Sequence, residues 1–174
     1  MATWLGVYRF GLQLQLDGIS IFQWHAHEML YGYSMAVIAG FLLTAAWNWT
    51  GEKTAAGAGL AWIFFPWLAA RLLMGAGTPY LPYAAIADLF FMLALGFATT
   101  RPIVKVRQKR QIPVLVIMAL LTLANLAFYL GAAGLWPPGV RLGIYGGLYI
   151  VLGMVLFMGR RVIPFFTQRG VGYP

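Results

Sequence analysis

Residues 24–51 read WHAHEMLYGYSMAVIAGFLLTAAWNWTG, and most positions after the first five are apolar. About 20 predominantly apolar residues are enough for a helix to cross the hydrocarbon core of a bilayer. Helix is the expected structure, because an isolated span must satisfy its own backbone hydrogen bonds. The stretch therefore predicts a membrane-spanning helix over residues 25–48, with His25, His27 and Glu28 at its beginning.

The composition of the whole chain agrees with a membrane setting. Its 174 residues are 61% hydrophobic and only 9% charged, and the mean hydropathy is +0.78. A soluble domain is about half apolar and a quarter charged, so lipid is the expected solvent. The net charge of +8 lies in short clusters between apolar runs, as in membrane loops, and we therefore expect no nucleic-acid partner. The chain has no cysteine, which excludes disulfides and thiolate ligands.

Four further apolar runs follow the first, with polar or proline-containing loops between them. The predicted spans cover residues 25–48, 59–75, 81–100, 112–134 and 140–159. Residues 1–24 hold too many polar groups for a clean span, and they predict an interfacial amphipathic helix or the remnant of a first span. We therefore predict an all-α, polytopic transmembrane bundle of about five spanning helices, with residues 25–174 as the membrane-embedded domain.

The distribution of basic residues predicts the orientation, because cytoplasmic loops carry the excess of lysine and arginine. If the loop at 101–113 is cytoplasmic, the loop at 48–58 and the tail after residue 159 are cytoplasmic too. The inner side then holds nine basic residues: Lys53, Arg101, Lys105, Arg107, Lys109, Arg110, Arg160, Arg161 and Arg169. The outer side holds two, Arg9 and Arg141. We expect a multi-pass protein of the bacterial inner membrane with a periplasmic N-terminus and a cytoplasmic C-terminus.

The ionisable residues at the start of the first span are candidates for a functional site, because such residues are costly inside a membrane. Residues of an α-helix advance by about 100° each, so His25 shares a face with Glu28 and Met29. That predicted inward face continues through small residues: Gly32, Ala36 and Gly40. His27 lies about 160° from His25 and is predicted to point elsewhere, with Tyr31.

One regular helix cannot bring both histidines to a single metal. They could share a centre only if the chain is extended around residues 24–26; otherwise they serve two centres, or one is structural. Imidazole binds haem iron and copper, and thioether binds copper(I). The alternative is that these residues only anchor the helix at a wet interface.

Three polar residues deeper in the sequence predict contacts between helices. Arg71 and Asp88 lie near the outer ends of the second and third spans, which a short loop makes antiparallel neighbours. An ion pair between them would remove much of the cost of burying either charge. Asn125 predicts an interhelical hydrogen bond, and the glycines at 139, 143 and 147 predict a close-packing stripe. Arg71 and Asp88 lie in the outer half of their spans, as do His25, His27 and Glu28, which predicts an outward-facing polar site between the first three spans.

Two stretches, residues 24–51 and GRRVIPFFTQRG at 159–170, together resemble the NnrS family. Members of this family are polytopic bacterial inner-membrane proteins described as containing haem and copper. They are associated with denitrification and with the response to nitric oxide and nitrosative stress. The resemblance therefore implies haem, and copper as a second metal.

The resemblance also carries residues over to this chain. By motif match it implies His25, His27 and Glu28 as candidate cofactor-binding residues. The position of Arg71 in the outer half of its span adds it to these candidates, as the partner of a haem propionate. The candidate metal ligands are His25, His27 and, for its thioether, Met29. The second motif contributes Arg160, Arg161, Pro164 and Thr167, with no role assigned.

The length of the chain bears on its expected partners. The resemblance implies roughly half of a family-length protein, as a fragment, a truncated gene or a shortened paralogue. Expected partners are the lipid bilayer, nitric oxide or a related small molecule, and either further copies of the chain or the missing C-terminal half. Two other functions compete with metal binding: a small-anion or proton-coupled transporter without redox chemistry, and a structural or assembly subunit. No residue pattern assigns a reaction.

Overall fold

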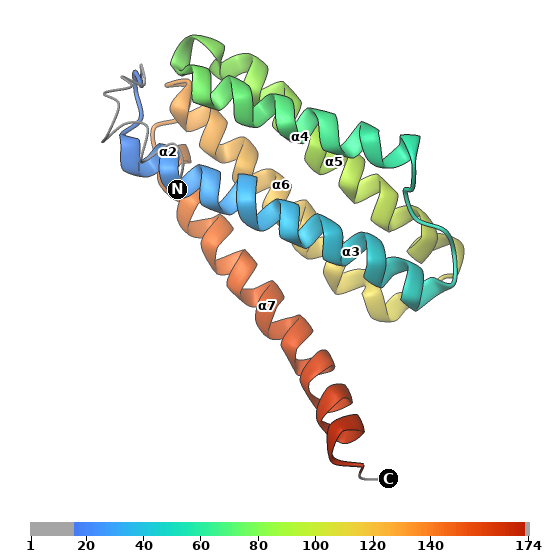
Figure 1. Cartoon of the computed structure of the whole chain (residues 1–174). Helices are drawn as coiled ribbons and strands as arrows, with labels where there is room; N and C mark the ends of the chain where they lie inside the picture. The colour runs from blue at the N-terminus through green and yellow to red at the C-terminus, as the bar shows by residue number, and fades with distance from the viewer. Residues whose placement is uncertain (1–15, 173–174) are drawn as a thin grey trace.

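Five long helices dominate the computed structural model, which describes residues 16–172 (Figure 1). The helices that are long and apolar enough to cross a membrane are Ile21–Thr50, Ala58–Ala76, Thr78–Lys105, Lys109–Ala132 and Gly139–Gln168. No strand occurs within the described residues. The prediction of an all-α bundle with five spans is confirmed. The N-terminal segment predicted over residues 1–24 lies largely outside the described residues.

Short π and 3₁₀ segments divide these spans into smaller elements. In chain order they are α2 Ile21–His27, η1 Glu28–Ser34, α3 Met35–Thr50, α4 Ala58–Ala76, η2 Thr78–Tyr80, α5 Leu81–Lys105, η3 Lys109–Gln111, α6 Ile112–Ala132 and α7 Gly139–Val171. The first span is therefore α2, η1 and α3 in succession. Figure 1 shows α3, α4, α5 and α6 running roughly alongside one another. The ends of several helices therefore lie close together at each end of the bundle.

The first span begins at a capping box, which explains why it starts before residue 25. The Ser20 side chain accepts a hydrogen bond from the Gln23 backbone N–H at 3.2 Å. The Gln23 side chain accepts one from the Ser20 backbone N–H at 2.8 Å. These two bonds satisfy N–H groups that a helix start leaves without partners. At the other end Gly51 closes α3 in the left-handed conformation, with φ 70°.

A π-helical stretch, η1, follows His27 directly and changes which side of the span faces inward. π-helical turns are wider than α-helical ones, so the residues after them are rotated about the axis. The residues buried after the stretch begins include Tyr31, Met35 and Leu42, whereas Gly40 is exposed. The predicted inward face is confirmed at Glu28, which contacts Arg71, and at the buried Gly32, but it is wrong at Gly40. Large apolar side chains fill the interior, and the face that carries His27 is the buried one.

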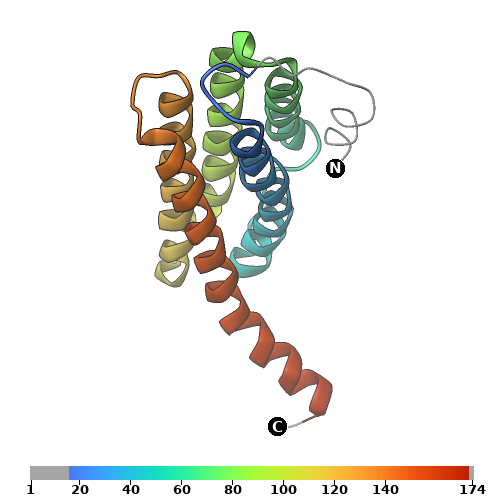
Figure 2. The same cartoon turned by 90° about the vertical axis from the view of Figure 1, so that its left-hand side faces the viewer.

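The last helix, α7, packs on the bundle over its first part and leaves it at its C-terminal end. A Cβ on Gly143 would lie 2.6 Å from the Cβ of Phe128, so this glycine lets α7 approach α6 closely, as predicted. The helix stays packed on the bundle as far as Met154 and Met158, which are 3% and 8% exposed, and only its last turns project away from the other helices (Figure 2). It continues past the predicted end at residue 159 to Val171, because the basic residues end the apolar span without ending the helix.

Candidate functional site

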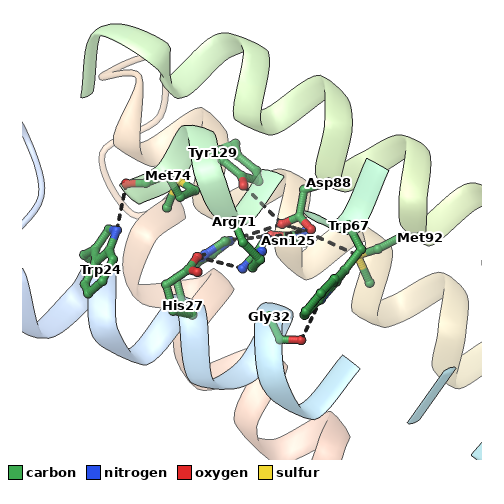
Figure 3. Close-up of polar contacts among 11 residues, drawn as sticks. Trp24, His27, Gly32, Trp67, Arg71, Met74, Asp88, Met92, Asn125 and Tyr129 are labelled. Carbon is green, nitrogen blue, oxygen red and sulfur yellow. Dashed lines mark hydrogen bonds and ion pairs between the residues drawn. The ribbon is translucent and has the colours of Figure 1, made fainter. Parts of the chain in front are cut away.

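Polar side chains from four spans meet near the end of the bundle where the first span begins (Figure 3). We call this group the buried network; it consists of His27, Glu28, Arg71, Asp88, Asn125 and Tyr129. Three of its members, His27, Asp88 and Asn125, are 0% exposed. Burying polar groups so completely is costly unless they are paired, so the contacts inside the network decide whether this end of the bundle is stable.

Arg71 of α4 joins the carboxylates of two other helices. Its Nη1 donates a hydrogen bond to Glu28 Oε1 at 2.6 Å, and its Nη2 lies 2.8 Å from Asp88 Oδ1. The predicted Arg71–Asp88 ion pair is therefore confirmed, and Glu28 adds a second carboxylate. Two anions around one guanidinium offset part of the cost of removing these charges from water.

Gly32 of η1 makes room for this arginine. A Cβ at Gly32 would lie 2.7 Å from Arg71 Nη1, which is closer than real side-chain carbons approach. The Gly32 carbonyl also accepts a hydrogen bond from Trp67 Nε1 at 2.9 Å. The Trp67 side chain thus connects α4 to the backbone of the first span, beside the ion pairs. Any side chain at this position would displace Arg71 from its place in the network.

Asp88 of α5 accepts hydrogen bonds from two side chains of α6. Asn125 Nδ2 donates to Asp88 Oδ2 at 3.0 Å, and the Tyr129 hydroxyl donates to the same oxygen at 3.1 Å. The predicted interhelical bond of Asn125 is confirmed. Sequence reasoning missed Tyr129, although its spacing of four from Asn125 places both on one helix face.

His27 lies at the centre of the buried network. Its Nε2 is 2.9 Å from Asn125 Oδ1, and its Nδ1 is 3.2 Å from Glu28 Oε1. The imidazole stacks on Phe128, with the ring centroids 4.2 Å apart. The prediction that His27 lies with Tyr31 is confirmed, since their ring centroids are 5.0 Å apart. The prediction that only His25 and Glu28 face inward is wrong, because His27 is buried and contacts Glu28 itself. Both ring nitrogens and one ring face are held by neighbouring side chains.

The buried network does not fit haem iron or copper. A histidine ligand needs a ring nitrogen with a free lone pair, and each nitrogen of His27 already faces a side-chain oxygen. Arg71 has two carboxylates beside it, which leaves little positive charge for a haem propionate. Within residues 16–172 no group of three or more His, Cys, Asp or Glu is arranged to hold a metal ion.

The remaining ligand candidates lie beside the network. His25 is half-buried on α2, and Met29 is 43% exposed on η1. The structure does not test either as a ligand, so their assignment stays a prediction. In the second motif, Pro164 and Thr167 are exposed on the part of α7 that projects from the bundle.

These observations define a class, a polytopic helical membrane protein with a charged network buried between its spans. The family model described as NnrS protein matches residues 1–174, and the chain belongs to this family. The match confirms the resemblance carried by the two sequence motifs. No curated protein matches the chain, and no solved structure matches it.

Proposed function

We propose that this chain contributes to the bacterial response to nitric oxide and nitrosative stress and that it binds haem, with copper as a second metal. The observation that carries this proposal is the family match over residues 1–174. The five apolar helices support a membrane location. The proposal includes the inner membrane, with the N-terminus in the periplasm, since the basic residues gather at the opposite ends of the spans.

In this proposal the candidate residues divide by role. Glu28 contacts both His27 and Arg71, and the three residues fix the positions of the first span and α4. His25 remains as the candidate ligand of haem iron, and Met29 as a thioether ligand of copper(I). When bound, haem and copper would supply redox chemistry and a binding position for a small molecule such as nitric oxide.

The test is an optical spectrum with metal analysis of protein purified from haem-replete cells. We expect a Soret band that His25→Ala abolishes and His27→Gln retains, because glutamine still reaches hydrogen-bond partners in the buried network. A band that survives His25→Ala and disappears in folded His27→Gln would assign the ligand to His27 and contradict the division of roles. Colourless, metal-free protein would contradict haem binding itself.

A second candidate function is proton-coupled or small-anion transport without redox chemistry. The observation that favours it is a continuous path of polar contacts inside the membrane. Glu28, whose side chain is 18% exposed, contacts His27, and His27 leads through Asn125 to the fully buried Asp88. Carboxylates and imidazoles in such series form proton relays in pumps and transporters.

Flux measurements in liposomes test the second function. We expect haem-free protein to carry protons or a small anion, and Asp88→Asn to abolish the flux. Glu52→Gln is the matched control, since Glu52 is the ion-paired carboxylate at the other end of the bundle. Equal flux with wild-type and folded Asp88→Asn protein would exclude transport through the buried network.

A further inference from the structure

An open cleft lies at the end of the bundle opposite the buried network, where α3 connects to α4 and α5 ends. It has a volume of about 760 Å³, and its charged lining residues are Glu52, Lys53, Arg101 and Lys105. Lys105 Nζ lies 2.8 Å from Glu52 Oε2. Between residues 16 and 172 no ion pair joins Lys53 or Arg101 to a carboxylate, so the cleft has an excess of positive charge.

The beginning of α4 adds to the positive potential of this cleft. The helix starts at Ala58 without a side-chain cap. The N–H groups of Gly59 and Leu60 donate to the carbonyls of Ala56 and Gly57, so the helix contributes its dipole rather than free donors. Gly59, in that turn, lines the cleft. The N-terminal end of a helix carries a partial positive charge and stabilises anions within about one turn. Two cations and a helix start therefore face the same space.

A second, apolar groove of about 510 Å³ adjoins the cleft and is lined mostly by α4, with Phe90 from α5. Trp62 lines both the cleft and the groove, and it is 70% exposed. The other residues of the groove are Ala58, Ala61, Phe65, Pro66, Ala69 and Phe90. On α5 the lining passes from Phe90 in the groove to Phe97 in the cleft and then to Arg101. A cationic cleft and an apolar groove thus meet at Trp62.

We propose that the cleft and the groove together bind one anionic phospholipid. Its phosphate contacts Lys53 and Arg101, and an acyl chain lies along the groove beside Trp62. The positive-inside distribution predicts that this end is cytoplasmic, and anionic lipids of that leaflet attract lysine and arginine. Free phosphate would match only the cations, whereas the groove matches hydrocarbon. Tryptophan is also typical of the level where headgroups and acyl chains meet.

Native mass spectrometry of the purified chain tests this site with phosphatidylglycerol and phosphatidylcholine as probes. We expect one retained phosphatidylglycerol per chain and much weaker retention of phosphatidylcholine. Lys53→Gln and Arg101→Gln should each weaken retention of phosphatidylglycerol about fivefold, as expected for one cation near a membrane surface. Arg141→Gln is the matched control, because Arg141 is an exposed arginine at the other end of the bundle.

A second variant tests binding of the acyl chain separately from binding of the headgroup. Ala61→Phe fills the groove without changing any charge, and we expect it to weaken retention of phosphatidylglycerol as well. Soluble glycerol phosphate should not displace the lipid. Equal retention of the two lipids, displacement by glycerol phosphate, or unchanged binding in both Arg101→Gln and Ala61→Phe would each overturn the proposal. Thermal melting of every variant checks that the protein remains folded.

Discussion

The two ends of the bundle contain ion pairs of the same length in opposite surroundings. Arg71 Nη2 lies 2.8 Å from Asp88 Oδ1, with the side chains 12% and 0% exposed. Lys105 Nζ also lies 2.8 Å from Glu52 Oε2, but these side chains are 65% and 38% exposed. The strength of a charge interaction at a given distance depends on the dielectric around it. The same distance therefore has very different consequences at the two ends.

The difference in exposure decides which charges hold helices together and which remain available to ligands. At the buried end, removing one partner leaves the other charge without water, so each residue depends on its neighbours. At the open end, water can replace a lost partner, and the side chains are free to exchange partners. The buried network thus acts as an internal connection between helices, and the cleft acts as a surface that an anion can enter.

The largest expected effect is the loss of Asp88. In Asp88→Ala the Arg71 guanidinium keeps only Glu28, and Asn125 and Tyr129 lose their common acceptor. Breaking a buried charge pair from one side costs about 3–5 kcal/mol. Denaturant or thermal unfolding in detergent measures the loss of stability.

The double variant Arg71→Ala with Asp88→Ala is the control for this effect. Removing both charges leaves no uncompensated Arg71, so we expect the double variant to be less destabilised than the sum of the two single variants. A loss in Asp88→Ala no greater than in Glu52→Ala would show that burial does not distinguish the two ends.

A smaller effect is expected from the packing of α7, which is tight at Gly143, where it faces α6, and open at the exposed Gly153. Gly143→Ala places a carbon 2.6 Å from the Cβ of Phe128 and 2.8 Å from the Ala124 carbonyl. Overpacking of this kind costs about 1–3 kcal/mol. Gly153→Ala on the same helix meets nothing within 4 Å. Unfolding of the two variants in one detergent compares them, and equal melting temperatures would contradict the close contact at Gly143.

The sequence was sufficient for the spans and for two contacts of the buried network. Apolar length and polar loops gave five helices whose bounds differ from the structure by a few residues, apart from the extension of α7. The Arg71–Asp88 pair was predictable because a short loop makes their helices neighbours. Asn125 was predictable as a polar residue inside a span, which needs a partner.

The position of His27 was not predictable from a regular helical period. The period gives the angle between residues, but it does not say which face is buried. Here Tyr31 and Met35 fill the interior, and the π stretch after His27 changes the register of the residues that follow. The contact of Tyr129 was not predictable from its residue type, because tyrosine is also common at membrane surfaces.

A modest effect is expected when the buried network loses one neutral donor. Tyr129→Phe removes the hydroxyl that donates to Asp88 Oδ2 at 3.1 Å, while Asn125 still donates to this oxygen. A hydrogen bond to a charged group contributes about 1.5–3 kcal/mol to stability, and the donor that remains on this carboxylate keeps the expected loss at the lower end of that range. Tyr145→Phe is the control, because Tyr145 is 55% exposed. A shift in unfolding midpoint with Tyr145→Phe as large as with Tyr129→Phe would contradict the assigned hydrogen bond.

The smallest effect on stability is expected for the exposed pair. Glu52→Gln should lower the free energy of unfolding by less than about 1 kcal/mol, as is typical of exposed ion pairs, and added salt should reduce the difference further because exposed charges are screened. The same change frees Lys105 from its carboxylate and makes the cleft more positive. We therefore expect Glu52→Gln to retain phosphatidylglycerol more strongly than the wild type in native mass spectrometry. Unchanged or weaker retention would show that the cations of the cleft do not act on the lipid, even if the exposed pair proves as weak as expected.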